Sequence, residues 1–150
     1  MDFHLDRLLN LPNITVLSCT QEDNQVFLKL RFLNEASGCP HCQTPSDQLN
    51  QNRPILIRDL PFSGQSVYLQ VPRRQFYCTP CKRYFTERLS FVDWERRYTQ
   101  RYEDYIYHRV QSTTVEQVSR EEELSWDQVQ GIFKYKFSQG GKSLGTRLNV

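Results

Sequence analysis

Two Cys-x-x-Cys pairs constrain the fold of this 150-residue chain more than any other feature. Cys39-Pro-His-Cys42 and Cys78-Thr-Pro-Cys81 are separated by thirty-five residues. Each short turn presents two thiolates on one side, and a hairpin between the turns can bring the two pairs together, as tetrahedral zinc requires. The spacing is that of a zinc ribbon. It predicts one structural Zn²⁺, bound by Cys39, Cys42, Cys78 and Cys81.

Other uses of these cysteines fit the pattern less well. A redox pair of the thioredoxin type needs one pair at a helix N-terminus, whereas this chain has two pairs in β-rich surroundings. A catalytic zinc is disfavoured, since four thiolates leave no position for water. His41 could in principle replace one cysteine as a ligand, but four cysteines already suffice. Cys19 belongs to neither pair, and we expect it to pack in a strand like a small apolar residue.

Composition and the start of the chain bear on the cellular location. A mean hydropathy of -0.66 and the lack of any apolar run near the ~20 residues that cross a bilayer exclude a transmembrane helix. Asp2 and Asp6 stand where a secretory signal would carry positive charge. We therefore predict a cytoplasmic, nucleoid-associated protein with no membrane partner. In that reducing compartment, cysteines are expected to be metal ligands or buried thiols and not disulfides.

Patterning in the first two thirds of the chain predicts one helix and four strands. The helix spans residues 4–11 and is ended by Pro12. Polar turns at 22–24 and 62–64 join the strands in pairs, and residues 34–54 are predicted to be a loop that carries the first cysteine pair. The strands are predicted over residues 14–19, 26–33, 55–61 and 65–71.

From Thr99 onward the hydrophobic periodicity becomes helical. Thr99 is the expected N-cap of a first helix, whose apolar stripe is formed by Tyr102, Tyr105, Ile106 and Val110. A second helix is predicted over residues 114–122. Ser125 and Gln128 form a capping box that begins a third helix, with one face formed by Trp126, Val129, Phe133 and Phe137.

The second and third of these helices are a candidate helix-turn-helix, in which the later helix enters the major groove of DNA. We expect its inward face to be Trp126, Val129 and Phe133. Gln suits adenine and Lys suits guanine or phosphate, so the outward face would be Asp127, Gln128, Gln130, Lys134 and Lys136. Two features oppose this interpretation: residues 121–123 are all Glu, and Glu123 stands where such turns usually have Gly with positive φ. An ordinary helical hairpin packed on the ribbon is the open alternative.

Basic residues are concentrated around the second cysteine pair. Residues 1–50 hold three bases and six acids, whereas residues 73–109 hold nine bases and five acids. Aromatic residues are interleaved with this basic stretch, a combination that suits a phosphate backbone. A solvated surface over buried aromatic residues is the alternative. The candidate phosphate contacts are Arg73, Arg74, Lys82, Arg83, Arg88, Arg96, Arg97 and Arg101.

No catalytic set emerges from the residue pattern. The residue pattern offers no convincing nucleophile to pair with a histidine at position 4, 41 or 108, and the sequence has neither a phosphate-binding glycine loop nor a convincing pair of carboxylates. We therefore expect binding and no catalysis.

The order of these features resembles the N-terminal region of insertion-sequence transposases of the ISL-three family. The resemblance extends over about residues 4–137. Its most specific part is the two cysteine pairs with the segment Arg58-Asp-Leu-Pro61 between them. Arg73-Arg-Gln-Phe-Tyr-Cys78 and Phe85-Thr-Glu87 are further points of likeness, and the helix-turn-helix departs from the family at Glu123.

The resemblance implies a zinc ribbon and a helix-turn-helix that recognise the terminal inverted repeats of the element. It also implies a following DDE domain of the RNase H-like fold, which cuts and joins DNA with two divalent metals. No Asp or Glu follows Asp127 in this chain, and the segment from Gly140 to Val150 does not resemble the entry into that domain. We therefore expect a truncated copy without catalytic activity. Its expected partner is double-stranded DNA, with a homodimer or a full-length transposase as further partners.

Together these observations predict an α+β fold. A zinc-ribbon-bearing antiparallel β domain is expected over residues 1–95, a three-helix segment with the helix-turn-helix over 96–138, and a tail over 139–150. The predicted function is recognition of transposon ends by the DNA-binding part of a transposase. The alternative is a zinc-ribbon module that binds another protein, or a regulator, with no role in transposition.

Overall fold

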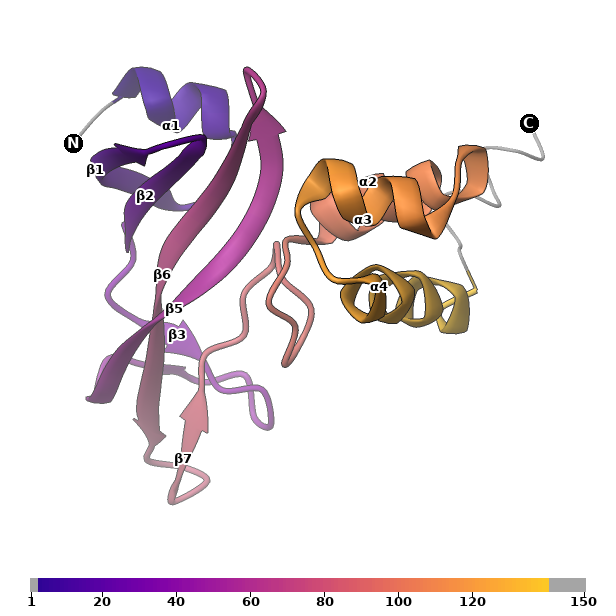
Figure 1. Cartoon of the computed structure of the whole chain (residues 1–150). Helices are drawn as coiled ribbons and strands as arrows, with labels where there is room; N and C mark the ends of the chain where they lie inside the picture. The colour runs from indigo at the N-terminus through magenta and orange to yellow at the C-terminus, as the bar shows by residue number, and fades with distance from the viewer. Residues whose placement is uncertain (1–2, 141–150) are drawn as a thin grey trace.

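The computed structural model describes residues 3–140, which form a β-sheet with a helical segment beside it (Figure 1). The elements in chain order are α1 (Phe3–Leu9), β1 (Ile14–Glu22), β2 (Gln25–Phe32), β3 (Ser37–Gly38), β4 (Pro45–Ser46), β5 (Leu49–Phe62), β6 (Gln65–Cys78), β7 (Arg83–Thr86), α2 (Gln100–Ser112), α3 (Val115–Glu122) and α4 (Trp126–Ser138). The predicted α+β class is confirmed. The described residues hold four helices, of which α2, α3 and α4 form the C-terminal segment. From residue 141 onward, the predicted tail lies outside the described residues.

The main sheet has five strands in the order β1-β2-β6-β5, with β7 paired to β6. Most neighbours are antiparallel, but β2 and β6 are parallel, with Leu28 beside Leu69. The prediction of an antiparallel domain is therefore wrong at this pairing. The chain leaves β2 through the first cysteine pair, returns along β5 and reverses again into β6, so β6 runs in the same direction as β2.

A two-residue turn sets the register of the long β5–β6 hairpin. Phe62 and Gln65 pair across Ser63, with a φ of 51°, and Gly64, with a φ of 74°. Two successive positive φ angles are typical of a type I′ turn, whose twist matches that of the flanking strands. The turn predicted at residues 62–64 is confirmed.

The loop predicted over residues 34–54 is partly strand. β3 and β4 form a small separate sheet around the first cysteine pair, and residues 49–54 are the first part of β5. These β5 residues are exposed and mostly polar, so the hydrophobic pattern carried no strand signal. Their backbone nevertheless pairs with β6, with Arg53 beside Arg73.

Helix α1 lies at one end of the sheet, and β3 and β7 lie at the other (Figure 1). The Asp6 carboxylate docks α1, because it accepts hydrogen bonds from Thr15 Oγ1 at 2.8 Å and from the Val16 N–H at 2.7 Å. Each fully buried aliphatic side chain contributes about 1.5–3 kcal/mol. The buried core of the sheet comprises Leu9, Ile14, Val16, Leu28, Leu30, Phe32, Ile57, Val67, Leu69, Val71, Phe91 and Val92.

The three C-terminal helices pack around a core of their own, beside β5 (Figure 1). Each begins at a hydroxyl N-cap: Thr99 for α2, Thr114 for α3 and Ser125 for α4. The cap predicted at Thr99 is confirmed. The buried members of this core are Tyr102, Ile106, Val118, Leu124, Val129 and Ile132. Within residues 3–140, no helix has both the length and the apolar character needed to cross a bilayer.

Candidate metal centre and nucleic-acid interface

β3 and β4 hold the first cysteine pair in a tight turn. The Cys39 N–H donates to Thr44 O at 3.0 Å, and the Gln43 N–H donates to Cys39 O at 2.9 Å. Gln43 reverses the chain with a φ of 68°. The His41 N–H lies 3.4 Å from Cys39 Sγ. A backbone N–H directed at sulfur favours the thiolate, which is the form that binds metal.

The second pair lies where β6 turns into β7. Cys78 is the last residue of β6, and Lys82 returns the chain with a φ of 55°. Phe76 and Phe85 stack at a centroid distance of 5.8 Å and form a small buried cluster with Cys39 and Cys78. The two turns are therefore held against each other by packing on their apolar side.

The four sulfur atoms of the two pairs meet at one point. All lie within 4.8 Å of one another, with 3.9 Å between the sulfurs of Cys39 and Cys81 and 3.4 Å between those of Cys42 and Cys78. A tetrahedral Zn²⁺ with Zn–S bonds of about 2.3 Å holds its sulfurs about 3.8 Å apart. Donor type, number and spacing thus fit one structural zinc, and four sulfurs leave no coordination position for water.

Crowding of the thiols perturbs their protonation. Hydrogen bonds from the Thr44 hydroxyl and backbone N–H lower the pKa of Cys42 to about 6. A hydrogen bond between the Cys81 and Cys42 side chains, together with burial, raises the pKa of Cys81 to about 12. Like charges this close oppose each other's ionisation, so four thiolates coexist only around a cation. Zn²⁺ would supply that charge and convert the cluster into a covalent-like crosslink between the two turns.

His41 and Cys19 were the two other candidates for this chemistry. The His41 side chain is exposed, and the metal-ligand cluster found among residues 3–140 consists of four cysteines. Cys19 lies in β1, but its side chain is exposed and not buried as expected. The reason is that β1 is buried only over its first three residues and then extends past the core.

The connection between α3 and α4 is a tight turn made without glycine. Glu123 ends α3 with φ 55° and ψ 42°, and the Leu124 N–H donates to Ser119 O at 3.1 Å. A non-glycine residue in this left-handed conformation costs roughly 1–2 kcal/mol. The predicted capping box at the start of α4 is confirmed, since Ser125 Oγ accepts from the Gln128 N–H at 3.0 Å and Gln128 Oε1 accepts from the Ser125 N–H at 2.8 Å.

The inward face of α4 differs from the predicted one. Val129 is buried as expected, but Ile132 is also 0% exposed, whereas Trp126 is 53% exposed and Phe137 is 65% exposed. Phe133 is half-buried and stacks on Tyr107 of α2. The prediction placed Trp126 inside because it shares a helical stripe with Val129 and Phe133. The core is instead filled by aliphatic side chains of α4 against Tyr102 and Ile106.

Two sequence families match adjoining parts of the chain. Residues 35–81 match the zinc-finger of transposase IS204/IS1001/IS1096/IS1165. Residues 87–135 match the helix-turn-helix domain of transposase family ISL3. This chain carries the N-terminal region of an ISL3-family transposase. The zinc ribbon, its one structural Zn²⁺ and the DNA-binding helix-turn-helix are thereby confirmed, and the interpretation as an ordinary helical hairpin falls away.

The chain is also similar to a curated insertion-sequence transposase. The transposase for insertion sequence element IS1001 from Bordetella parapertussis is 32% identical over 96 residues, which are 64% of this chain. The chain spans only 24% of the length of that relative. No solved structure matches the chain.

In this transposase region, α4 presents a polar row to solvent. Asp127, Gln128 and Lys134 are exposed, and Gln130 is half-buried. Lys136 is largely covered and its Nζ lies 3.0 Å from an Asp104 carboxylate oxygen of α2. Four of the five outward residues predicted from the sequence are thus at least partly exposed to solvent.

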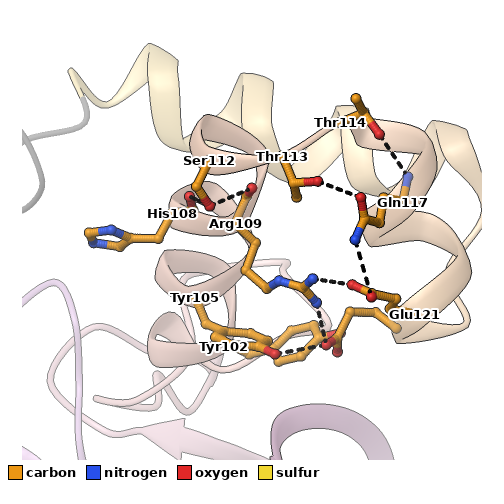
Figure 2. A network of polar contacts seen from close by, with 10 residues as sticks. Tyr102, Tyr105, His108, Arg109, Ser112, Thr113, Thr114, Gln117 and Glu121 are labelled. Atoms are coloured by element: carbon orange, nitrogen blue, oxygen red, sulfur yellow. Dashed lines mark hydrogen bonds and ion pairs between the residues drawn. The ribbon is translucent and has the colours of Figure 1, made fainter.

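Side chains of α2 engage two of the three consecutive glutamates at the end of α3, Glu121 and Glu122. Arg109 of α2 pairs with Glu121, as Figure 2 shows, and also reaches Glu122 at 3.3 Å. Glu122 is buried and accepts hydrogen bonds from the hydroxyls of Tyr102 and Tyr105, both at 2.9 Å. Only Glu123 keeps an exposed carboxylate without a described ion pair. The expected repulsion between this segment and phosphates is therefore reduced.

Three of the predicted phosphate contacts are engaged inside the transposase region. Arg74 is buried and forms a two-pronged ion pair with Glu87, at 2.8 and 2.7 Å. Arg96 pairs with the fully buried Glu103, and Arg101 pairs with Asp59. Sequence reasoning missed these acidic partners because they lie 13, 7 and 42 positions away along the chain.

The remaining candidates lie at the surface. Lys82 and Arg83 are exposed on the turn next to the zinc cluster, and Arg97 is exposed before α2. Arg73 and Arg88 lie over the ring of Trp94, at 5.6 and 4.2 Å from its centre. Trp94 is itself exposed and lines, with these two arginines and Arg97, a cavity of about 430 Å³. The structure thus places the Trp94 ring against the guanidinium groups of two of these candidates.

Proposed function

We propose that this chain recognises the terminal inverted repeats of an insertion sequence by binding duplex DNA. The observation that carries the proposal is the exposed polar row of α4, capped and oriented by the helix-turn-helix, on the same chain as a four-cysteine zinc ribbon. A polar helix face of this kind reads base edges in the major groove. The ribbon adds a basic surface that attracts phosphate without choosing sequence.

In this proposal each contact has a separate role. Hydrogen bonds to base edges are made by Gln128, Gln130 and Lys134. The Asp127 carboxylate repels phosphate at its position or accepts a hydrogen bond from the amino group of a cytosine. The phosphate contacts are the basic side chains that remain accessible: Arg73, Lys82, Arg83, Arg88 and Arg97. Arg74, Arg96 and Arg101 are left out because their guanidinium groups already pair with buried or half-buried carboxylates.

A gel-shift titration with inverted-repeat DNA and with random duplex tests the proposal. We expect the repeat to bind on the order of a thousandfold more tightly, as for other specific sites. Five phosphate contacts predict that log K falls with log salt at a slope of about -4.5. Equal affinity for the two DNAs would refute recognition of the repeat. A salt slope shallower than about -1.8, the value for two phosphate contacts, would refute the proposed set of phosphate contacts.

The proposed role of this region is DNA binding. The nucleoid location, and the homodimer or the full-length transposase as partners, stay predictions. Sedimentation of the purified chain, alone and mixed with the full-length enzyme, tests the two protein partners. A protein that sediments with a partner but gives no gel shift would support the alternative of a protein-interaction module.

A further inference from the structure

The segment Arg58-Asp-Leu-Pro61 is the part of the sequence that neither zinc binding nor base recognition explains. It lies in β5 at the edge of the sheet, where the chain enters α2. The Arg58 N–H donates to Arg97 O, and the Thr99 N–H donates to Arg58 O, both at 2.9 Å. The backbone before α2 is thus bonded to β5 through an isolated parallel β-bridge between Arg58 and Tyr98.

Asp59 fixes the first turn of α2. Its carboxylate is 2% exposed and accepts hydrogen bonds from the Thr99 hydroxyl at 2.8 Å and from Arg101 Nε and Nη2 at 2.8 and 2.6 Å. Thr99 is the N-cap of α2. One buried carboxylate therefore holds both the cap and the first turn of the helix to the sheet.

Arg58 makes the connection to α3. Its guanidinium is buried between the rings of Tyr68 in β6 and Tyr102 in α2, at 5.4 and 5.1 Å. Nη2 donates to Ser66 Oγ at 3.0 Å and lies 3.6 Å from Glu122 Oε1. Glu122 is the acid on which Tyr102, Tyr105 and Arg109 converge, and Figure 2 shows the labelled members of that network between α2 and α3.

Stability alone does not account for this arrangement. Arg58 Nε and Nη1 are buried without a hydrogen-bond partner, and each such group costs about 1–3 kcal/mol. An apolar side chain of similar volume usually stabilises a fold as well as a buried ion pair does, but it does not fix one direction. A charged pair held against two aromatic rings favours one relative orientation of the sheet and the helices.

We propose that Arg58 and Asp59 are positioning residues that hold the helix-turn-helix at one fixed orientation to the zinc ribbon, so that the protein recognises two DNA segments at one separation. Leu60 completes the contact by packing on the core of the helices. Only the claim about the spacing of two DNA segments rests on the proposed function; the fixed orientation of the helices on the sheet does not. Without the clamp, the chain between β7 and α2 would let the two modules bind DNA independently.

The spacing of the two DNA segments is the decisive variable. A hydroxyl-radical footprint of the full chain on the repeat is expected to show two protected segments, and insertions are placed between them. Five inserted base pairs move one segment by about 17 Å and by half a helical turn. We expect the wild type to lose at least about tenfold in affinity on that insertion, and to regain part of it at ten base pairs.

Arg58→Met and Asp59→Asn are the test variants, and Arg53→Met is the matched control, since Arg53 is an exposed arginine of the same strand. Arg58→Met is expected to fold, because Glu122 retains three donors and a thioether fits between two aromatic rings. Both test variants should lose less than about threefold on the insertion, whereas the control should behave like the wild type. An insertion penalty equal to that of the wild type in both variants would overturn the proposal.

A measurement without DNA separates this inference from the proposed function. Residual dipolar couplings of the wild type should fit one alignment tensor for the zinc ribbon and the helices, and those of Arg58→Met should need two. One shared tensor in both test variants would overturn the clamp, even if the repeat is bound. Failure of every variant and of the wild type to prefer the repeat would instead refute the proposed function.

Discussion

Ile132→Ala tests which face of α4 packs in the core. Ile132 is 0% exposed and lies among Tyr102, Ile106, Val118 and Val129. The change removes three buried carbon atoms, which at about 0.8 kcal/mol each accounts for about 2.4 kcal/mol. The cavity left behind adds to this, so we expect the free energy of unfolding to fall by about 3 kcal/mol, within the usual range of 2–5.

Urea unfolding followed by helical circular dichroism measures that loss. For a chain of this size each kcal/mol corresponds to about 2–4 °C in Tm, so the variant should melt about 6–12 °C lower. Trp126→Ala is the control at an exposed position of the same helix, and its cost should stay within about 0.5 kcal/mol because surface changes rarely exceed that. If Trp126→Ala destabilised the protein more than Ile132→Ala, the described orientation of α4 would be wrong.

Three further predictions concern the turn, the phosphate contacts and the cysteines. Glu123→Gly should stabilise the protein by about 0.5 kcal/mol, because relief of the left-handed strain exceeds the greater chain entropy of Gly; Glu123→Ala should not, and equal thermal melts of the two variants would contradict this. The double variant Lys82→Gln and Arg83→Gln should weaken binding to repeat and random DNA alike and make the salt slope shallower by about 2; loss confined to the repeat would show that these side chains read bases. Cys78→Ser should lose the zinc, whereas Cys19→Ser should retain it, as measured by metal content of the purified variants.

The sequence alone was enough to locate the zinc cluster and the helix starts. Four cysteines in two short turns have few uses in a β-rich chain, so the ligand set followed from spacing. Thr99 and Ser125 were recognised as caps because their hydroxyls act on backbone N–H groups within three residues. Local chemistry of this kind is written in adjacent residues and does not depend on the rest of the fold.

What the sequence did not reveal depends on long-range partners. Arg74 and Arg101 were predicted to contact phosphate. In the fold, Arg74 pairs with Glu87 and Arg101 pairs with Asp59, and neither acidic partner is near in the sequence. The parallel pairing of β2 with β6 follows from the path of the chain and leaves no trace in either strand. The face of α4 was misjudged because an aromatic stripe and an aliphatic stripe overlap on that helix, and only the shape of the partner core selects between them.

The most direct test of the account is zinc stoichiometry together with the effect of removing the metal. Elemental analysis of the reduced, purified chain should give one zinc per molecule. A strong chelator should then collapse the β3–β4 and β7 end of the sheet in backbone amide spectra and weaken DNA binding, while the core of α2, α3 and α4 persists. A chain that purifies without zinc, or that keeps the same spectrum and the same DNA affinity after chelation, would contradict the account.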